Sequence, residues 1–186
     1  MRATKDVDVV VEATSTLEYQ RLGQRLAARG FWPDRDGPIC RWQMAALVLD
    51  VMPTDPSILG FGNVWFAEAV RTASTFRLGS GRTIRLISGP VFLATKLEAF
   101  KGRGAGDLLA SPDLEDLVTV VDGRPEIVDE VRSGSERLRA YLADEIGALV
   151  AVAGFDDAVS GHLPQDPASQ SRVPMVLGRL RSLRSG

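Results

Sequence analysis

The sequence predicts an α/β fold of the α+β kind, in which a mixed sheet with flanking helices is followed by a helical C-terminal half. Two observations lead to this prediction. Before residue 88, apolar runs of strand length alternate with a helical segment and a hairpin signal, whereas after Gly89-Pro90 each periodic segment has helical spacing. The chain has 186 residues and a net charge of −2, so it lacks the basic excess of proteins built for nonspecific nucleic-acid binding.

The first strand is predicted at residues 6–11, which read Asp-Val-Asp-Val-Val-Val. Valine is β-branched and favours strands, and a nearly continuous valine run predicts a strand that is covered on both faces. Ser15 and Glu18 then have the spacing of a capping box, in which each side chain bonds a backbone N–H at the helix start. We therefore expect a helix at residues 17–29, closed by Gly30.

The second strand is predicted at residues 41–52, where an almost wholly apolar run surrounds Asp50. Cys40 lies just before it. As the only cysteine it forms no intramolecular disulfide, and we expect a buried, inert thiol. A short helix at residues 65–70 then precedes a hairpin whose turn is Gly79-Ser80-Gly81-Arg82. The sheet is therefore expected to be mixed.

Helical spacing dominates the rest of the chain. Four helices are predicted there, at residues 91–103, 113–121, 125–133 and 136–150. We divide the chain into an α/β core at residues 1–88, a helical region at 89–160, and a loop with a basic tail at 161–186. In that tail, residues 175–184 are either a basic amphipathic helix or a frayed end.

The candidates for chemistry are three carboxylates, Asp6, Asp8 and Asp50. Side chains alternate along a strand, so Asp6 and Asp8 point to the same side. Two carboxylates on an apolar strand repel each other unless a cation lies between them, and hard divalent ions such as Mg²⁺ prefer oxygen ligands. If the two predicted strands are neighbours, Asp50 is a third acid at the same edge. The alternative is that Asp6 and Asp8 simply pair with Lys5, Arg2 or a neighbouring arginine.

Three converging carboxylates are the arrangement that two-metal phosphoryl transfer requires. One ion organises the phosphates of a nucleotide, while the other lowers the pKa of the attacking hydroxyl. The sequence therefore predicts a Mg²⁺ site formed by Asp6, Asp8 and Asp50, which serve both as metal ligands and as catalytic residues.

These residues lie in recognisable motifs. Arg2-Ala3-Thr4-Lys5-Asp6-Val7-Asp8 closely resembles the Arg-x-Thr-x-Asp-x-Asp segment of AbiEii-type nucleotidyltransferases. These belong to the DNA polymerase beta superfamily and include toxins of type IV toxin–antitoxin systems. Leu49-Asp50-Val51 is similar to the third-aspartate strand of that family. Lys96, then Arg103, then Asp113-Leu114-Glu115-Asp116-Leu117 are similar to its helical Lys…Arg…Asp-x-x-Asp-Leu signature.

The resemblance, over residues 2–122, implies a nucleotidyltransferase fold and a Mg²⁺-dependent transfer of a nucleoside monophosphate from an NTP to a hydroxyl acceptor. The partners that it implies are an NTP, a tRNA or protein acceptor, and a cognate antitoxin. It implies that Asp6 and Asp8 bind the metal and that Asp50 assists activation of the acceptor. It also implies that Thr4, Lys96 and Arg103 contact the substrate.

Lys96 and Arg103 are seven residues apart on one predicted helix, and hence on one face. There they would present two positive charges to a triphosphate. The alternative is a solvated helix face, or salt bridges to Asp107 and Asp113.

One part of the family pattern is not found ahead of the first motif. Family members carry a Gly-Gly or Gly-Ser turn ahead of the Asp-x-Asp strand, and its backbone amides bind the nucleotide phosphates. Only five residues precede Asp6, and Ser80-Gly81 is a poor substitute because it lies in the hairpin turn after all three aspartates. Two interpretations follow: an enzyme whose start lies upstream of Met1, or an inactive nucleotidyltransferase-fold remnant that binds a protein or RNA partner.

No targeting or membrane segment is predicted. The N-terminus is charged from its second residue and has no apolar signal region. The longest apolar runs, residues 44–49 and 148–153, are too short to span a bilayer. We therefore expect a cytoplasmic protein without a membrane partner.

Overall fold

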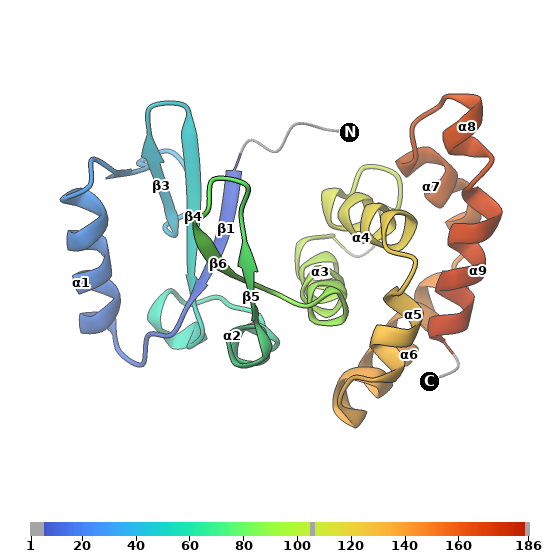
Figure 1. Cartoon of the computed structure of the whole chain (residues 1–186), viewed down its shortest axis with the longest axis horizontal. Coiled ribbons are helices and arrows are strands. Elements are labelled where there is room, and N and C mark those ends of the chain that lie inside the picture. The colour runs from blue at the N-terminus through green and yellow to red at the C-terminus, as the bar shows by residue number, and fades with distance from the viewer. Residues whose placement is uncertain (1–5, 105–106, 185–186) are drawn as a thin grey trace. The chain divides into compact units, whose positions relative to one another are not determined.

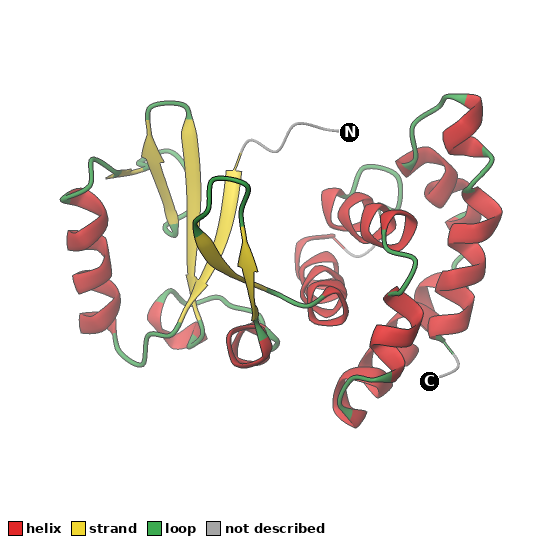
Figure 2. Cartoon of the chain, viewed as in Figure 1, coloured by secondary structure: helices red, strands yellow, loops and turns green. Residues whose placement is uncertain are grey.

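The computed structural model describes residues 6–104 and 107–184. Its contacts divide the chain into two compact units, Met1–Ala73 and Ser74–Gly186 (Figure 1). The first unit contains a mixed four-stranded sheet, and the second contains a two-stranded sheet followed by helices (Figure 2). The predicted α/β (α+β) class is therefore confirmed. The boundary predicted at residue 88 lies one hairpin later than this division.

The sheet of the first unit has parallel and antiparallel neighbours. Its strands lie in the order β1 (Asp6–Val11), β4 (Leu47–Pro53), β3 (Arg41–Met44) and β2 (Trp32–Pro33). β1 and β4 are parallel, whereas β3 is antiparallel to both β4 and β2. Parallel strands need a crossover connection, and α1 (Thr16–Ala27) lies in the one between β1 and β4.

β1 lies at the edge of the described sheet, with β4 as its neighbour. Val7 is 48% exposed, and the remaining valines of the strand are half-buried. The expectation that this strand is covered on both faces is therefore wrong for the described part of the chain. A valine run reports strand propensity, but it does not report how many elements pack against the strand.

The run predicted as one strand, residues 41–52, folds into two. β3 and β4 pair as an antiparallel hairpin with Met44 opposite Leu47. The turn between them contains Ala45 with a φ of 52°. A positive φ is uncommon outside glycine, asparagine and aspartate, so the sequence carries none of the residues that usually mark such a turn.

The N-terminus of α1 is capped as predicted, with one difference. The Ser15 hydroxyl accepts from the Glu18 backbone N–H at 3.3 Å. The Glu18 carboxylate bonds the backbone N–H and the hydroxyl of Thr14, each at 2.8 Å, rather than the N–H of Ser15. These bonds lower the pKa of Glu18, because the backbone and side-chain donors of Thr14 favour the charged carboxylate.

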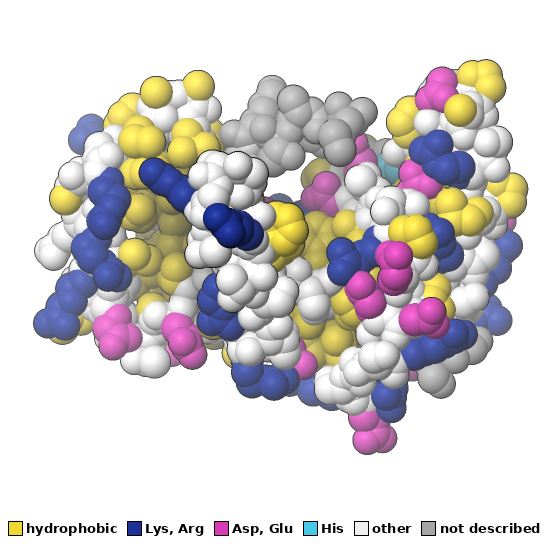
Figure 3. All heavy atoms as spheres, in the orientation of Figure 1, with side chains coloured by type: hydrophobic (Ala, Val, Ile, Leu, Met, Phe, Trp, Pro, Cys, Tyr) yellow, Lys and Arg dark blue, Asp and Glu magenta, His cyan; other side chains and the backbone are white. Residues whose placement is uncertain are grey.

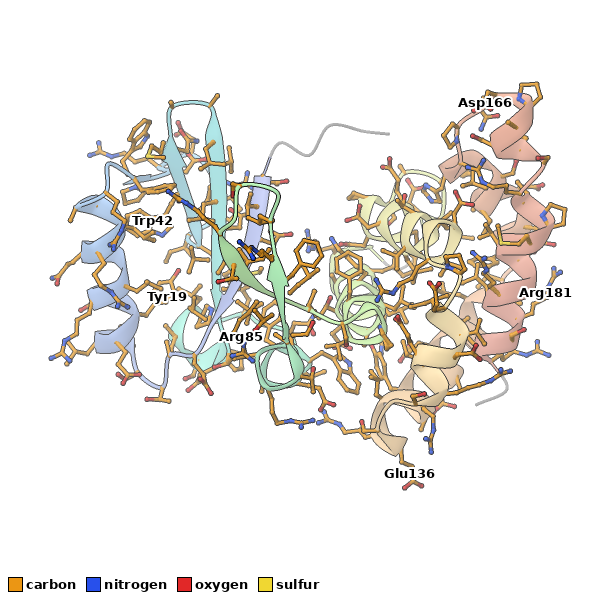
Figure 4. All side chains as sticks on the ribbon, in the orientation of Figure 1. Tyr19, Trp42, Arg85, Glu136, Asp166 and Arg181 are labelled. Atoms are coloured by element: carbon orange, nitrogen blue, oxygen red, sulfur yellow. The ribbon has the colours of Figure 1, made fainter. Side chains whose placement is uncertain are left out.

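α1 packs on the sheet through a small contact, and no residue within Thr16–Ala27 is buried. The Tyr19 hydroxyl donates to the Val51 carbonyl at 2.9 Å. Gly23 lies against Trp42, where an added Cβ would come 3.0 Å from the indole ring. Tyr19 and Trp42 both lie between the helix and the sheet (Figure 4). Basic side chains gather along this helix (Figure 3), and they include the exposed Arg21 and Arg25.

Two short helical segments follow β4 in the first unit, η1 (Pro56–Ile58) and α2 (Phe66–Thr72). The buried apolar residues of this unit include three at α2, namely Trp65, Phe66 and Ala69, and three elsewhere, namely Ala13, Cys40 and Val51. The predicted burial of Cys40 is confirmed, since 5% of the residue is exposed. Burial raises the pKa of its thiol, and the negative charge of Asp50 adds to this effect.

The second unit begins with the predicted hairpin, which is confirmed. β5 (Ser74–Arg77) and β6 (Thr83–Leu86) are antiparallel, with Phe76 opposite Ile84. Gly81 has a φ of +82° in the turn between them, a conformation that glycine adopts without strain. Ser80-Gly81 therefore lies in a hairpin turn, as the sequence predicted.

Helices make up the rest of the second unit, and the four predicted there are confirmed. The helices are α3 (Gly89–Gly104), α4 (Pro112–Gly123), α5 (Ile127–Arg132), α6 (Glu136–Val150), α7 (Phe155–His162), α8 (Pro167–Gln170) and α9 (Val173–Leu183). Ser111 and Ser135 cap α4 and α6, each accepting a backbone N–H at 3.3 Å. Most of the buried apolar residues of the described chain lie among these helices.

The C-terminal segment is not a loop with a solvated tail. α9 buries one side in the helical core through Val176, Leu177, Leu180 and Leu183. Its basic side chains bond within the same unit: Arg179 donates to the backbone carbonyls of Val121 and Asp122, and Arg181 pairs with Asp156 at 2.8 Å (Figure 4). The amphipathic-helix alternative is thus confirmed, because the apolar stripe of this segment finds a core to pack against.

Candidate functional site

The three predicted aspartates lie on neighbouring strands of the first unit. β1 and β4 pair in parallel with Asp8 directly opposite Asp50. Because side chains alternate along a strand, Asp6, Asp8 and Asp50 lie on one face of the sheet. The expectation that the two aspartate-bearing strands are neighbours is confirmed, and we refer to these three residues as the aspartate cluster.

The members of the aspartate cluster differ in exposure. Asp50 is 8% exposed and lies on β4, an interior strand of the sheet. Asp8 is exposed, and 47% of the Asp6 side chain is exposed. A buried carboxylate needs a cation or several hydrogen-bond donors, so the partner of Asp50 decides what this end of the cluster can bind.

That partner is Arg41, a residue that the sequence analysis did not single out. The β3–β4 register places Arg41 opposite Asp50. The guanidinium Nε donates to Asp50 Oδ1 at 2.8 Å, and Nη2 donates to Oδ2 at 2.7 Å. The same Nη2 lies 3.8 Å from Asp6 Oδ2. Two parallel charge-assisted bonds are among the strongest polar contacts in proteins, and they raise the pKa of Arg41.

The turn at Ala45 explains both the pair and its absence from the predictions. In one continuous strand, Arg41 and Asp50 would be about 30 Å apart, since each residue advances about 3.3 Å. A two-residue turn at Ala45-Ala46 instead folds the run symmetrically and pairs the two charges. Arg41 and Asp50 are equidistant from Ala45-Ala46, but since neither residue marks a turn, this symmetry alone did not reveal the contact.

The donor set fits a hard cation in part. Asp6 and Asp8 supply carboxylate oxygens, which Mg²⁺ prefers as ligands. Asp50 does not fit in this arrangement, because both of its oxygens accept from Arg41. Among the described residues, no group of three or more His, Cys, Asp or Glu side chains is placed to hold a metal ion.

A second cluster lies in the helical unit and contains the residues of the Lys…Arg…Asp-x-x-Asp pattern. Lys96 Nζ of α3 lies 2.6 Å from Asp116 Oδ2 and 3.7 Å from Asp113 Oδ1, both on α4. Arg103 Nη2 lies 3.7 Å from the same Asp113 oxygen. Lys96 also lies over the ring of Phe92, 5.4 Å from its centroid. The four charged residues therefore converge, and the salt bridges to Asp113 are present.

The expected pairing with Asp107 takes a different form. Asp107 Oδ1 accepts from the backbone N–H groups of Leu109 and Ala110, at 3.1 Å and 2.9 Å. It lines a cavity of about 180 Å³ together with Phe100, Arg103 and residues 110–113. The helical cluster thus borders a small open space between α3 and the start of α4. Thr4, the remaining predicted substrate contact, lies outside the described residues.

Comparisons with known proteins found no match to this chain among family models, curated proteins or solved structures. Within the described part of the chain, no helix is both long enough and apolar enough to cross a membrane.

Proposed function

We propose that this protein is a Mg²⁺-dependent nucleotidyltransferase of the AbiEii type, which transfers a nucleoside monophosphate from an NTP to a hydroxyl acceptor. One observation carries the proposal: the parallel register of β1 and β4 sets Asp8 opposite Asp50, with Asp6 on the same face. The motif resemblance adds support, since the aspartates of two separate motifs are neighbours in the fold. The place of action that we propose is the cytoplasm.

In this proposal each described residue has a chemical role. Asp6 and Asp8 hold the Mg²⁺ ion, which when bound would neutralise the phosphates of the NTP. Asp50 is fixed by Arg41 on the same face of the sheet, and it orients the reacting groups beside Asp6 and Asp8. Lys96 already has Asp116 at 2.6 Å, so a phosphate that takes Lys96 must compete with that carboxylate.

The acceptor and the partner follow from the resemblance. We propose a tRNA or a protein as the acceptor, and a cognate antitoxin as the partner of a toxin of this type. An adjacent reading frame for a small DNA-binding protein would support the toxin–antitoxin assignment.

A second candidate function is favoured by the Arg41–Asp50 pair. Since Asp50 is fully bonded to a guanidinium, the cluster needs no added ion at that position. A nucleotidyltransferase-fold protein that has lost catalysis and binds a protein or RNA partner is consistent with such a neutralised site.

Nucleotide transfer separates the two functions. Purified protein would be incubated with each labelled NTP, Mg²⁺ and either total tRNA or cell lysate, alongside Asp6→Asn/Asp8→Asn. The enzyme proposal expects label transfer that falls roughly 100-fold or more in the double variant, because the ion loses both carboxylates. Asp36→Asn is the matched control for loss of a carboxylate, since Asp36 is exposed in the same unit and lies between β2 and β3 rather than on β1 or β4.

No transfer by the wild type, nor by a version extended upstream, would overturn the enzyme proposal and leave the binding function. Transfer that persists in Asp6→Asn/Asp8→Asn would show instead that the chemistry lies elsewhere.

A further inference from the structure

The β5–β6 hairpin of the second unit is exposed along its whole length. Every residue of both strands is exposed, and within the described part of the chain each strand has only the other as its neighbour in the sheet (Figure 1). A two-stranded hairpin is marginally stable in water by itself, and a third strand gives it independent stability. The outer edge of each strand also presents backbone N–H and C=O groups that a further strand can bond.

One face of this hairpin is apolar. Phe76 lies directly opposite Ile84, and Ser74 lies opposite Leu86, so these four side chains share a face. Phe76, Ile84 and Leu86 are each 40–50% exposed, although they are large and apolar. Single exposed apolar residues are ordinary, whereas apolar residues gathered on one exposed face mark an interaction site.

The other face of the hairpin carries positive charge. Arg77 and Arg85 pair with threonines of the opposite strand, so both arginines lie on the face away from Phe76 (Figure 4). Arg82 follows in the turn, and residues 72–97 contain no Asp or Glu. The hairpin therefore has arginines without any acid of its own, which makes it complementary to a negatively charged partner.

We propose that β5 binds an extended segment of a partner protein, in which apolar and acidic residues alternate, as a third strand of this sheet. Alternation along such a strand places its apolar side chains beside Phe76 and its carboxylates beside Arg77. We assign the segment to β5 because Phe76 is the most exposed large apolar residue of the hairpin, and because Arg85 of β6 already has an interaction of its own. The inference does not rest on the proposed function, since it involves neither Mg²⁺ nor a nucleotide.

Two other occupants suit this surface less well. Pairing of β5 with β5 of a second copy would add arginines to a face that already carries them, and like charges opposed across strands are destabilising. The apolar face is also small beside the roughly 20–30 residues that each partner contributes to a standard interface. Nucleic-acid bases stack on aromatic rings, whereas Phe76 lies beside the aliphatic Ile84 and Leu86. An acidic and apolar protein segment matches both faces.

The test uses an octapeptide in which Val and Glu alternate, labelled with fluorescein. Its binding to the full chain would be followed by fluorescence anisotropy. A Val-Lys octapeptide keeps the apolar face and reverses the charge. A block octapeptide, with all Val before all Glu, keeps the composition and removes the alternation. We expect the full chain to bind the Val-Glu octapeptide roughly tenfold or more tightly than either control, and added salt to weaken that binding.

Substitutions on the two faces should separate the two contributions. Arg77→Glu should weaken binding of the Val-Glu octapeptide roughly tenfold and strengthen binding of the Val-Lys octapeptide, because the charge beside the added strand is reversed. Phe76→Ser should weaken binding of both, because the apolar contact is lost. Arg35→Glu is the matched control for charge, since Arg35 is exposed and lies in the first unit. Circular dichroism checks the fold of each variant.

Amide hydrogen exchange followed by nuclear magnetic resonance would locate the bound peptide. The N–H groups at the outer edge of β5 should exchange roughly tenfold more slowly at saturation, because a third strand bonds them. The N–H groups at the outer edge of β6 should keep their rates. Slowing at the outer edge of β6 alone would overturn the assignment to β5.

Three results would overturn the proposal as a whole. The first is no saturable binding of the Val-Glu octapeptide below about 1 mM, or equal binding of the block octapeptide. The second is a dimer in analytical ultracentrifugation that Phe76→Ser abolishes, which would assign the apolar face to a second copy. The third is tighter binding of an oligouridine than of the Val-Glu octapeptide, lost in Phe76→Ser, which would assign the face to a nucleic acid.

Discussion

At the scale of single residues, Asp113 is the most enclosed charge of the helical unit. It is 4% exposed, and it lies in the first turn of α4, where the helix dipole favours a negative charge. Lys96 and Arg103 both approach it at 3.7 Å. Arg103 is 73% exposed and contributes little, so Lys96 is the main compensating charge.

This burial predicts unequal costs for two neighbouring substitutions. Asp113→Asn should lower the free energy of unfolding by about 2 kcal/mol, because it leaves Lys96 with one carboxylate and a buried amide in place of a buried ion. Asp116→Asn should cost under about 1 kcal/mol, since the Asp116 side chain is 47% exposed. Urea unfolding followed by circular dichroism at 222 nm checks the order; equal costs would show that burial does not set it.

Tyr19 gives a prediction about pH. Burial raises its pKa from 10.0 to about 12. The folded state therefore keeps the proton that the unfolded state loses, so stability is unaffected below pH 10 and falls as pH rises from about 10 to 12. The chain has two tyrosines, so the difference in absorbance at 295 nm between wild type and Tyr19→Phe isolates this titration. A midpoint near 10 for that difference would contradict the prediction.

At the scale of elements, the β3–β4 turn decides the composition of the site. Ala45 has a φ of 52°, a region in which an added Cβ costs roughly 1 kcal/mol or more. The turn nevertheless forms, because the pairing on either side of it joins Arg41 to Asp50 and aligns apolar side chains on the other face. Local strain is thus outweighed by the contacts that the turn permits.

Substitution of glycine at each of the two turn positions should change the free energy of unfolding in opposite directions. Ala45→Gly should raise the free energy of unfolding by about 0.5 kcal/mol, because relief of the positive φ exceeds the added entropy of the unfolded chain. Ala46→Gly should lower it by about 0.5–1 kcal/mol, since Ala46 has no positive φ and only the entropic cost remains. The midpoints of urea unfolding by tryptophan fluorescence measure both; the same sign for the two would refute this account of the turn.

At the scale of the whole molecule, the two units differ in how much apolar surface they enclose. Most of the buried apolar residues of the described chain belong to Ser74–Gly186. The first unit has an exposed edge strand and a helix without a buried residue within its bounds. Since burial of apolar surface is the main stabilising contribution, we expect the first unit to be the less stable one.

The chain carries probes that report on the units separately. All three tryptophans, Trp32, Trp42 and Trp65, lie in Met1–Ala73, whereas most helices lie in Ser74–Gly186. Tryptophan fluorescence should therefore change at a lower urea concentration than circular dichroism at 222 nm. Coincident transitions would instead indicate that the two units unfold as one cooperative body.

The sequence by itself determined most of the elements and placed the three aspartates in strands, although it joined β3 and β4 into one run. Valine propensity, helical spacing and turn residues act over a few positions, so β1, α1, the β5–β6 hairpin and the helices through α6 are readable without a structure. Side-chain alternation likewise places Asp6 and Asp8 on one face from local geometry alone.

Only the tertiary structure decided which charges meet. Arg41 contacts Asp50 because of a turn at Ala45 that no residue type in the sequence indicates. Lys96 and Arg103 lie near Asp113 and do not form an open, solvated helix face. Ion pairs between elements depend on register and packing, which propensity and spacing do not specify. The aspartate cluster was therefore predictable as a set of acids, whereas its own cation was not.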